Sequence, residues 1–303
     1  MAALGVLPWM VGALYQALAS RADLVSFPPP GVLVEAGEVS VHLDCRGEGL
    51  PVVILEAGLT SGSTSWARVH DALAEQTRVC AYDRPGLDWS EPIEEMAGPA
   101  VIAQRLRAAL DAAGIGGPYV LVGMSAGGVY VREYFAQFPE GVAGMVLVDS
   151  SHEAQTERMK PIDDTRLIGP QTLLTICRFL QPFGWVRASG YTDGVIDGLW
   201  PADTTHEAAA AMRANVNRSH ACRAIQLEIL SFRSALAEPR EPRSLGDLPL
   251  LVLSQGKPPE AMEELGLSLE QARARRATWD DLQIELAALS TRASDGSPLR
   301  AVT

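Results

Sequence analysis

Basic side chains are scarce in this chain of 303 residues. It has 25 Lys and Arg against 37 Asp and Glu, so its formal net charge at pH 7 is -12. No run of basic residues interrupts this pattern. Nucleic acids and anionic membrane surfaces bind basic patches, so the charge balance argues against both as partners.

Cysteine is also rare, and the four cysteines have no short paired spacing. A structural metal site or a redox-active pair needs such spacing, so the sequence predicts neither. Cys45 and Cys80 lie in expected strands, where we expect buried thiols. A disulfide between Cys177 and Cys222 is compatible with the sequence, but no pattern demands it.

The chain is not short of apolar residues, which make up 47% of it, while charged residues make up 20%. Length and composition therefore predict a folded protein with one main domain and an insertion. We expect an N-terminal segment at residues 1–29, the first part of a core at 30–150, a helical cap at 151–243 and the second part of the core at 244–303.

The N-terminus is the longest apolar stretch, from Ala2 to Ala19, broken only by Pro8 and Gln16. Its length is near the lower limit for a membrane-spanning helix. The small residues at 17–19 resemble the cleavage site of an export signal, although no Lys or Arg precedes the run. We expect a membrane anchor at residues 2–19 or an export signal. The alternative is a buried or docked helix on a cytoplasmic protein.

Short apolar runs alternate with helical patterns along the proposed core. A continuous apolar run predicts a strand buried on both faces, and strand–helix alternation predicts a mostly parallel sheet covered by helices on both faces. The fold class is therefore α/β. The expected strands are 32–35, 39–45, 52–55, 79–82, 119–124, 144–148 and 248–253, and the expected helices on the sheet are 64–76, 100–113 and 126–137.

The strand pattern disappears between Ser151 and about Arg243. Helical patterns replace it at residues 171–180, 206–216 and 221–236. This block is longer than an ordinary connection, so we interpret it as a helical cap. The alternative is a set of ordinary crossover helices.

The segment from Tyr119 to Gly128 carries the clearest chemical signal. An apolar run ends in Gly-Met-Ser-Ala-Gly, with Ser125 between Gly123 and Gly127, and a helical pattern follows. This strand–turn–helix context is that of a nucleophile elbow, in which a strained turn exposes a serine hydroxyl above the sheet. Small neighbours are needed because that turn is tight.

Histidine is missing where such a serine would need it. In this architecture the order along the chain is serine, then an acid, then histidine. The five histidines are His42, His70, His152, His206 and His220, so none lies in the last eighty or so residues.

Four blocks of sequence resemble the α/β-hydrolase superfamily, and within it the capped, lipase- and esterase-like members. The resemblance covers residues 30 to 290 and implies an α/β-hydrolase fold. The chain departs from the usual pattern at Glu56-Ala57, where many relatives have a His-Gly turn, and at Asp88, where the pattern has glycine. The matching blocks are Glu56–Leu59, Tyr82–Ser90, Gly123–Gly128 and Leu147–Glu153.

The resemblance implies a serine hydrolase acting on a small ester-like substrate. Ser125 would attack the acyl carbonyl, and the backbone N–H groups of Leu59 and Ala126 would stabilise the resulting oxyanion. This chemistry uses no cofactor and no metal.

The acid and the base are harder to assign. The family position for the acid lies beyond the seventh strand, where the chain has no aspartate but has Glu260, Glu263 and Glu264. These fit a solvated face better, and Asp149 at the end of the sixth strand is the alternative acid. His152 is the best available candidate for the base, with a structural hydrogen bond as the competing interpretation.

The last thirteen residues, 291–303, are polar and lack a strand pattern. We therefore expect the last strand and helix of the fold to be missing, together with the histidine they would carry, as in a truncated copy. Two functions remain open. One is a carboxylic-ester hydrolase, whose activity depends on a base that the sequence does not show after the seventh strand. The other is a non-catalytic protein that binds an apolar ligand or a partner.

Overall fold

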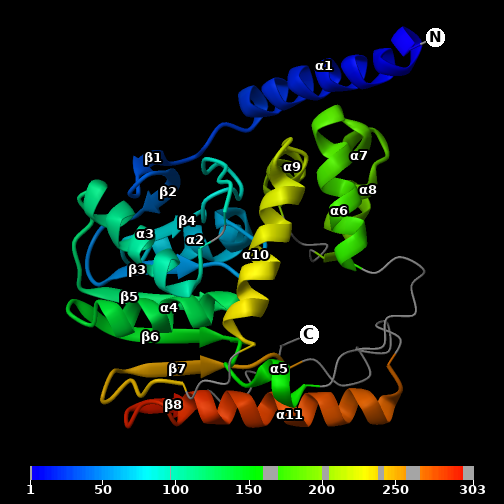
Figure 1. The fold of residues 1–303 in the computed structure, drawn as a ribbon. Coiled ribbons are helices and arrows are strands. Elements are labelled where there is room, and N and C mark those ends of the chain that lie inside the picture. The colour runs from blue at the N-terminus through cyan, green and yellow to red at the C-terminus, as the bar shows by residue number, and fades with distance from the viewer. Residues whose placement is uncertain are drawn as a thin grey trace.

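An eight-stranded sheet forms the centre of the computed structural model, which describes residues 2–95, 97–159, 170–199, 205–237, 242–256 and 267–295. The strand order is β1-β2-β4-β3-β5-β6-β7-β8 (Figure 1). β2 is antiparallel to β1 and β4, and all other neighbours are parallel. The strands are β1 (Val32–Glu35), β2 (Ser40–Arg46), β3 (Val52–Glu56), β4 (Val79–Tyr82), β5 (Tyr119–Met124), β6 (Val142–Val148), β7 (Leu250–Leu253) and β8 (Ala293–Asp295).

Helices cover both faces of the sheet, which explains why the central strands are apolar along their whole length. All five residues of β3 are buried. Leu106, Tyr134 and Leu286 from three helices pack on one face, and Trp66 packs on the other. The helices involved are η1 (Ser63–Trp66), α2 (Ala67–Ala74), α3 (Pro99–Ala112), α4 (Ala126–Gln137) and α11 (Leu269–Ala287). The predicted α/β class and the two-sided cover are confirmed.

A helical insertion separates β6 from β7, as the sequence predicts. Its last helix, α10, passes the carboxyl ends of the central strands (Figure 1). A disulfide between Cys177 and Cys222 joins α6 to α10, so the pairing that the sequence left open is present. The elements described are α5 (Gln155–Arg158), α6 (Pro170–Leu180), η2 (Gln181–Phe183), α7 (Trp185–Ala188), α8 (Tyr191–Leu199), α9 (His206–Val216) and α10 (Ala221–Ala235).

The expectation of buried thiols at Cys45 and Cys80 is wrong. The two residues are direct partners in the antiparallel register of β2 and β4, with Cα atoms 4.0 Å apart, and they form a disulfide. The register depends on tertiary pairing of strands 35 residues apart, so sequence spacing gave no sign of it.

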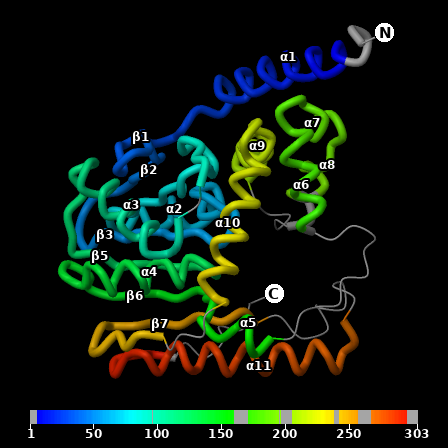
Figure 2. Tube along the Cα trace, in the orientation of Figure 1, coloured from blue at the N-terminus to red at the C-terminus, as the bar shows by residue number. Residues whose placement is uncertain are grey.

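The apolar N-terminus forms one helix, α1 (Ala2–Ser26), docked on the helical insertion (Figure 2). The Trp9 ring packs edge-on against Phe183, with centroids 4.8 Å apart. Gln16 is buried and donates to the Asn217 carbonyl at 2.6 Å, and Asp23 pairs with Arg187 at 2.6 Å. These contacts match the docked-helix alternative, and the predicted membrane anchor is not confirmed. Among the described residues, no helix has the length and apolarity needed to span a bilayer.

The carboxyl-terminal edge also corrects an expectation. Residues 293–295, for which the sequence showed no strand pattern, pair in parallel with β7 as the short strand β8. The preceding α11 begins at Leu269 and is held at its start by a capping box between Ser268 and Gln271. Three residues are too few to specify a strand by their own sequence. Residues 293–295 form β8 because they pair with β7.

Candidate active site

Ser125 lies at the sharp turn between β5 and α4. Its backbone has φ 51° and ψ −120°, a region that non-glycine residues rarely adopt. Neighbouring backbone holds it there: the Ser125 N–H donates to the Val148 carbonyl at 3.0 Å, and the Ser151 N–H donates to the Ser125 carbonyl at 2.9 Å. Strain of this kind persists only where the surroundings over-determine it, and it is concentrated at functional sites.

The two glycines of the elbow are required by close backbone approach. A Cβ atom on Gly123 would lie 2.6 Å from the Gly127 carbonyl oxygen. A Cβ atom on Gly127 would meet the Glu56 carbonyl oxygen and, at 2.7 Å, that of Ala57. These neighbours are main-chain atoms, so no side-chain movement can make room. The turn therefore has the strand–turn–helix geometry that the sequence predicts.

The loop after β3, residues 57–61, lies against the elbow and is called the oxyanion loop below. A Cβ atom on Gly58 would lie 3.4 Å from the Ser125 Cβ, which places this loop beside the serine. The Leu59 side chain packs with the cluster that contains Ala126 and Val129. Within the described residues, neither the Leu59 nor the Ala126 backbone N–H has a hydrogen-bond acceptor. Both predicted donors are therefore near Ser125 and uncommitted.

A buried charge cluster behind the oxyanion loop was missed by the sequence analysis. Arg84 is fully buried and pairs with Glu56 at 2.5 Å and with Glu228, on α10, at 2.6 Å. The Tyr82 hydroxyl donates to the second oxygen of Glu56 at 2.5 Å. Burial raises the pKa of Glu56 to about 6, against the opposing effect of the Arg84 charge. The departure Glu56-Ala57 noted in the sequence is thus one half of an internal ion pair.

Asp149 follows β6 and, like Ser125, has a left-handed backbone, with φ 45°. Its Oδ1 accepts from the Trp279 indole N–H at 2.8 Å and from the Gln255 backbone N–H at 3.3 Å. Two elements beyond β6 therefore fix this carboxylate at the carboxyl edge of the sheet. The alternative acids Glu260, Glu263 and Glu264 lie outside the described residues.

His152 is buried three residues beyond Asp149. Its Nδ1 accepts from the Ala154 backbone N–H at 3.0 Å, and its Nε2 lies 3.5 Å from Glu285 Oε2. Burial lowers the pKa of His152. No side chain in the described ranges forms a hydrogen bond with the Ser125 hydroxyl. The structure therefore brings Ser125, Leu59 and Ala126 together and leaves the predicted base role of His152 without a supporting contact.

The other departure from the family pattern, Asp88, also has a left-handed backbone, with φ 38°. Its Oδ2 accepts from the Thr64 hydroxyl at 2.7 Å. Burial, with the nearby Asp83 charge adding to it, raises the pKa of Asp88 to about 7. An aspartate replaces glycine here at the cost of backbone strain, and it ties the β4 loop to η1.

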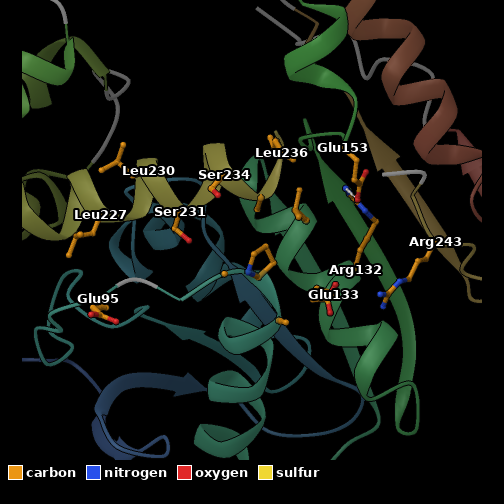
Figure 3. Close-up of a pocket in the computed structure, with 15 residues that line it drawn as sticks. Glu95, Arg132, Glu133, Glu153, Leu227, Leu230, Ser231, Ser234, Leu236 and Arg243 are labelled. Carbon is orange, nitrogen blue, oxygen red and sulfur yellow. Dashed lines mark hydrogen bonds and ion pairs between the residues drawn. The ribbon is translucent and has the colours of Figure 1, made fainter. Parts of the chain in front are cut away.

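A pocket of about 810 Å³ lies between α10, the start of α3 and the outer side of α4 (Figure 3). Val129 and Leu236 line it and also belong to the cluster that contains Leu59, so only one layer of side chains separates it from the oxyanion loop. Arg132 and Glu153 pair at 2.9 Å at one end of it. Ser125 does not line this pocket. In the ranges described, no group of three or more His, Cys, Asp and Glu residues could hold a metal ion.

Comparison with known proteins agrees with this geometry. Residues 51–183 match a family model described as the alpha/beta hydrolase fold. An uncharacterized protein of Schizosaccharomyces pombe is 33% identical over 165 residues, which is 52% of this chain and 29% of that protein. The chain thus spans less than a third of that relative's length.

Solved structures share the fold at low sequence identity. A thermophilic esterase from Thermogutta terrifontis has a TM-score of 0.55 and 19% identity, over 87% of this chain and 88% of that chain. An enol-lactonase from Burkholderia xenovorans has a TM-score of 0.53 and 17% identity, over 87% and 90%. At such identities the likeness establishes the fold alone.

Proposed function

We propose that this chain, which has the α/β-hydrolase fold, is a serine hydrolase that cleaves small carboxylic esters through an acyl-enzyme on Ser125. The observation that carries the proposal is the strained backbone of Ser125 with the oxyanion loop packed directly against it. A strained serine at this turn exposes its hydroxyl, and two uncommitted N–H groups beside it suit a developing oxyanion.

The remaining roles follow from position. Asp149 is the proposed acid, because Trp279 and Gln255 hold its carboxylate at the edge where Ser125 stands. The helical insertion, within residues 151–243, is the proposed cap, because α10 crosses that edge (Figure 1). His152 is the base predicted from the sequence, and its test is His152→Gln. A loss of serine reactivity of about a hundredfold or more would support the base role, and an unchanged reactivity would exclude it.

A non-catalytic binding protein is the second candidate. It is favoured by the absence, in the described part of the chain, of a hydrogen-bond partner for the Ser125 hydroxyl. Without a base the serine keeps an ordinary alcohol reactivity, and the oxyanion groups alone give only residual catalysis.

A fluorophosphonate probe separates the two candidates, because it modifies activated serines covalently. Ser125→Ala is the test variant, and Ser234→Ala, an exposed serine of α10, is the matched control. The hydrolase proposal predicts labelling of the wild type and of Ser234→Ala, and none of Ser125→Ala. A wild type that melts cooperatively and takes up no probe would favour the binding protein.

A further inference from the structure

The oxyanion loop is held mainly by Arg84. The guanidinium Nη1 donates to the Ala57 carbonyl at 3.0 Å, and Nη2 donates to the carbonyls of Gly58 and Ser61 at 2.7 and 3.0 Å. With three carbonyl oxygens turned toward one cation, the Leu59 N–H between them stays without an acceptor in the described residues. Arg84 therefore determines which groups of this loop point away from it.

Glu228 reaches the same loop from another part of the chain. Its side chain is fully buried, and its two carboxylate oxygens accept hydrogen bonds from different donors. Oε1 accepts from Arg84 Nε at 2.6 Å, and Oε2 accepts from the Thr60 backbone N–H at 2.6 Å. A single carboxylate thus binds both the cation that positions the loop and the loop itself.

Thr60 is the residue of the loop that most needs this support. Its backbone φ is 63°, which is costly for a β-branched residue. The hydrogen bond from the Thr60 N–H to Glu228 is strong because its acceptor is a charged carboxylate. It therefore stabilises the strained backbone conformation of Thr60. Without it, relaxation of Thr60 would rotate the Leu59–Thr60 and Thr60–Ser61 peptide groups. That rotation would displace Leu59, whose own N–H belongs to the preceding peptide group.

Glu228 lies on α10, 168 residues along the chain from Thr60, and α10 belongs to the helical insertion. The loop belongs to the core. The second ion pair between α10 and the core, Arg223 with Glu94, lies at the surface, where Glu94 is 82% exposed. Of these two ion pairs, only the one made by Glu228 reaches the site, while Phe232 and Leu236 add apolar packing in the cluster that contains Leu59.

We propose that Glu228 is a positioning residue, which holds the oxyanion loop in its active conformation only while α10 is seated on the core. Seating of the insertion and formation of the oxyanion hole are then one coupled event. The proposal rests on the proposed function for its catalytic meaning, but the positioning itself is measurable without any reaction.

The test compares Glu228→Gln with Glu94→Gln by hydrogen exchange and mass spectrometry. Each substitution removes one carboxylate charge that pairs with an arginine, but only Glu228 contacts the loop. We expect amides of segment 57–62 to exchange about tenfold faster or more in Glu228→Gln and at the wild-type rate in Glu94→Gln. Glu228→Asp, which keeps the charge on a shorter stem, serves if Glu228→Gln does not fold.

Phosphonylation kinetics supply a readout that a merely structural role would not move. Loss of a positioned oxyanion donor lowers the maximal rate of phosphonylation, by about 10- to 100-fold, and leaves the half-saturating probe concentration unchanged. Equal loop exchange in the two variants would overturn the proposal. An unlabelled wild type whose loop still loosens in Glu228→Gln would overturn the hydrolase function and leave the positioning role established.

Discussion

The buried charges behind the oxyanion loop and the buried side chains around the end of β6 differ in how completely their polar atoms are satisfied. On the oxyanion side, Arg84 contacts three loop carbonyls and two carboxylates, all within 3.0 Å. On the acid side, around the end of β6, four buried polar atoms have no hydrogen-bond partner within the described residues. They are Arg132 Nε, His152 Nε2, Glu153 Oε2 and Gln283 Oε1.

This difference shows which part of the chemistry the fold specifies by itself. A buried polar atom without a hydrogen-bond partner lowers the stability of the folded state by about 1–3 kcal/mol. The acid side is therefore the less stabilised of the two. The oxyanion side is built from main-chain groups and one internal ion cluster. Its geometry therefore depends on no side chain outside that cluster. We therefore expect substitutions on the oxyanion side to have the larger effects.

Arg84→Met should have the largest effect. Removing the cation leaves Glu56 and Glu228 buried without a counter-charge, and breaking a buried pair in this way costs about 3–5 kcal/mol. Urea unfolding measures the loss. Arg107→Met is the control, because its pair with Asp111 is exposed and is worth less than about 1 kcal/mol. Similar losses in the two variants would contradict the contrast between buried and exposed pairs.

Gly127→Ala should come next, with a loss of about 3 kcal/mol or failure to fold. Its Cβ would collide with the carbonyls of Glu56 and Ala57, which are main-chain atoms of β3 and the loop. Gly194→Ala on α8 is the matched control, since a Cβ there meets nothing within 4 Å. The control should be neutral or more stable by up to about 1 kcal/mol. A well-folded Gly127→Ala with unchanged unfolding midpoint would refute the close approach.

Trp279→Phe sharpens the comparison from the acid side. It removes the indole N–H that fixes Asp149 at 2.8 Å and leaves the longer bond from Gln255. We expect a loss of about 1 kcal/mol, because this site is partly exposed. Trp185→Phe, which alters an exposed indole, should change stability less. A loss as large as that of Arg84→Met would mean that the two sides are equally rigid.

Asp88→Asn should have the smallest effect at low pH and a visible effect at high pH. Burial and the Asp83 charge raise the pKa of Asp88 from 3.8 to about 7, so between these values the folded state holds a proton that the unfolded state lacks. The stability that this proton supports is complete below pH 3.8 and is lost as pH rises through 7. Asn keeps an acceptor for Thr64, so the variant should lose less stability than the wild type between pH 5 and 8, by about 1–3 kcal/mol. Parallel urea midpoints across that range would count against the raised pKa.

The sequence predicted those features of the fold and the site that depend on residues close together in the chain. The apolar runs gave the parallel sheet, and the small residues around Ser125 gave the elbow, because both depend on neighbours in the chain. Cys45 with Cys80 and Thr60 with Glu228 could not be found in this way, since each pair meets only when distant elements pack. The apolar α1 predicted a membrane anchor, which is not confirmed, and its Gln16 and Trp9 contact the insertion. Composition does not distinguish burial in lipid from burial against protein.

Trapping the acyl-enzyme would test the central claim most directly. The chain is incubated with an activated small ester, quenched in acid, and examined by intact-mass spectrometry and peptide mapping. The account predicts one acyl group per chain, on the peptide that contains Ser125, and none in Ser125→Ala. A folded chain that stays unacylated, or that is acylated equally in Ser125→Ala, would contradict it.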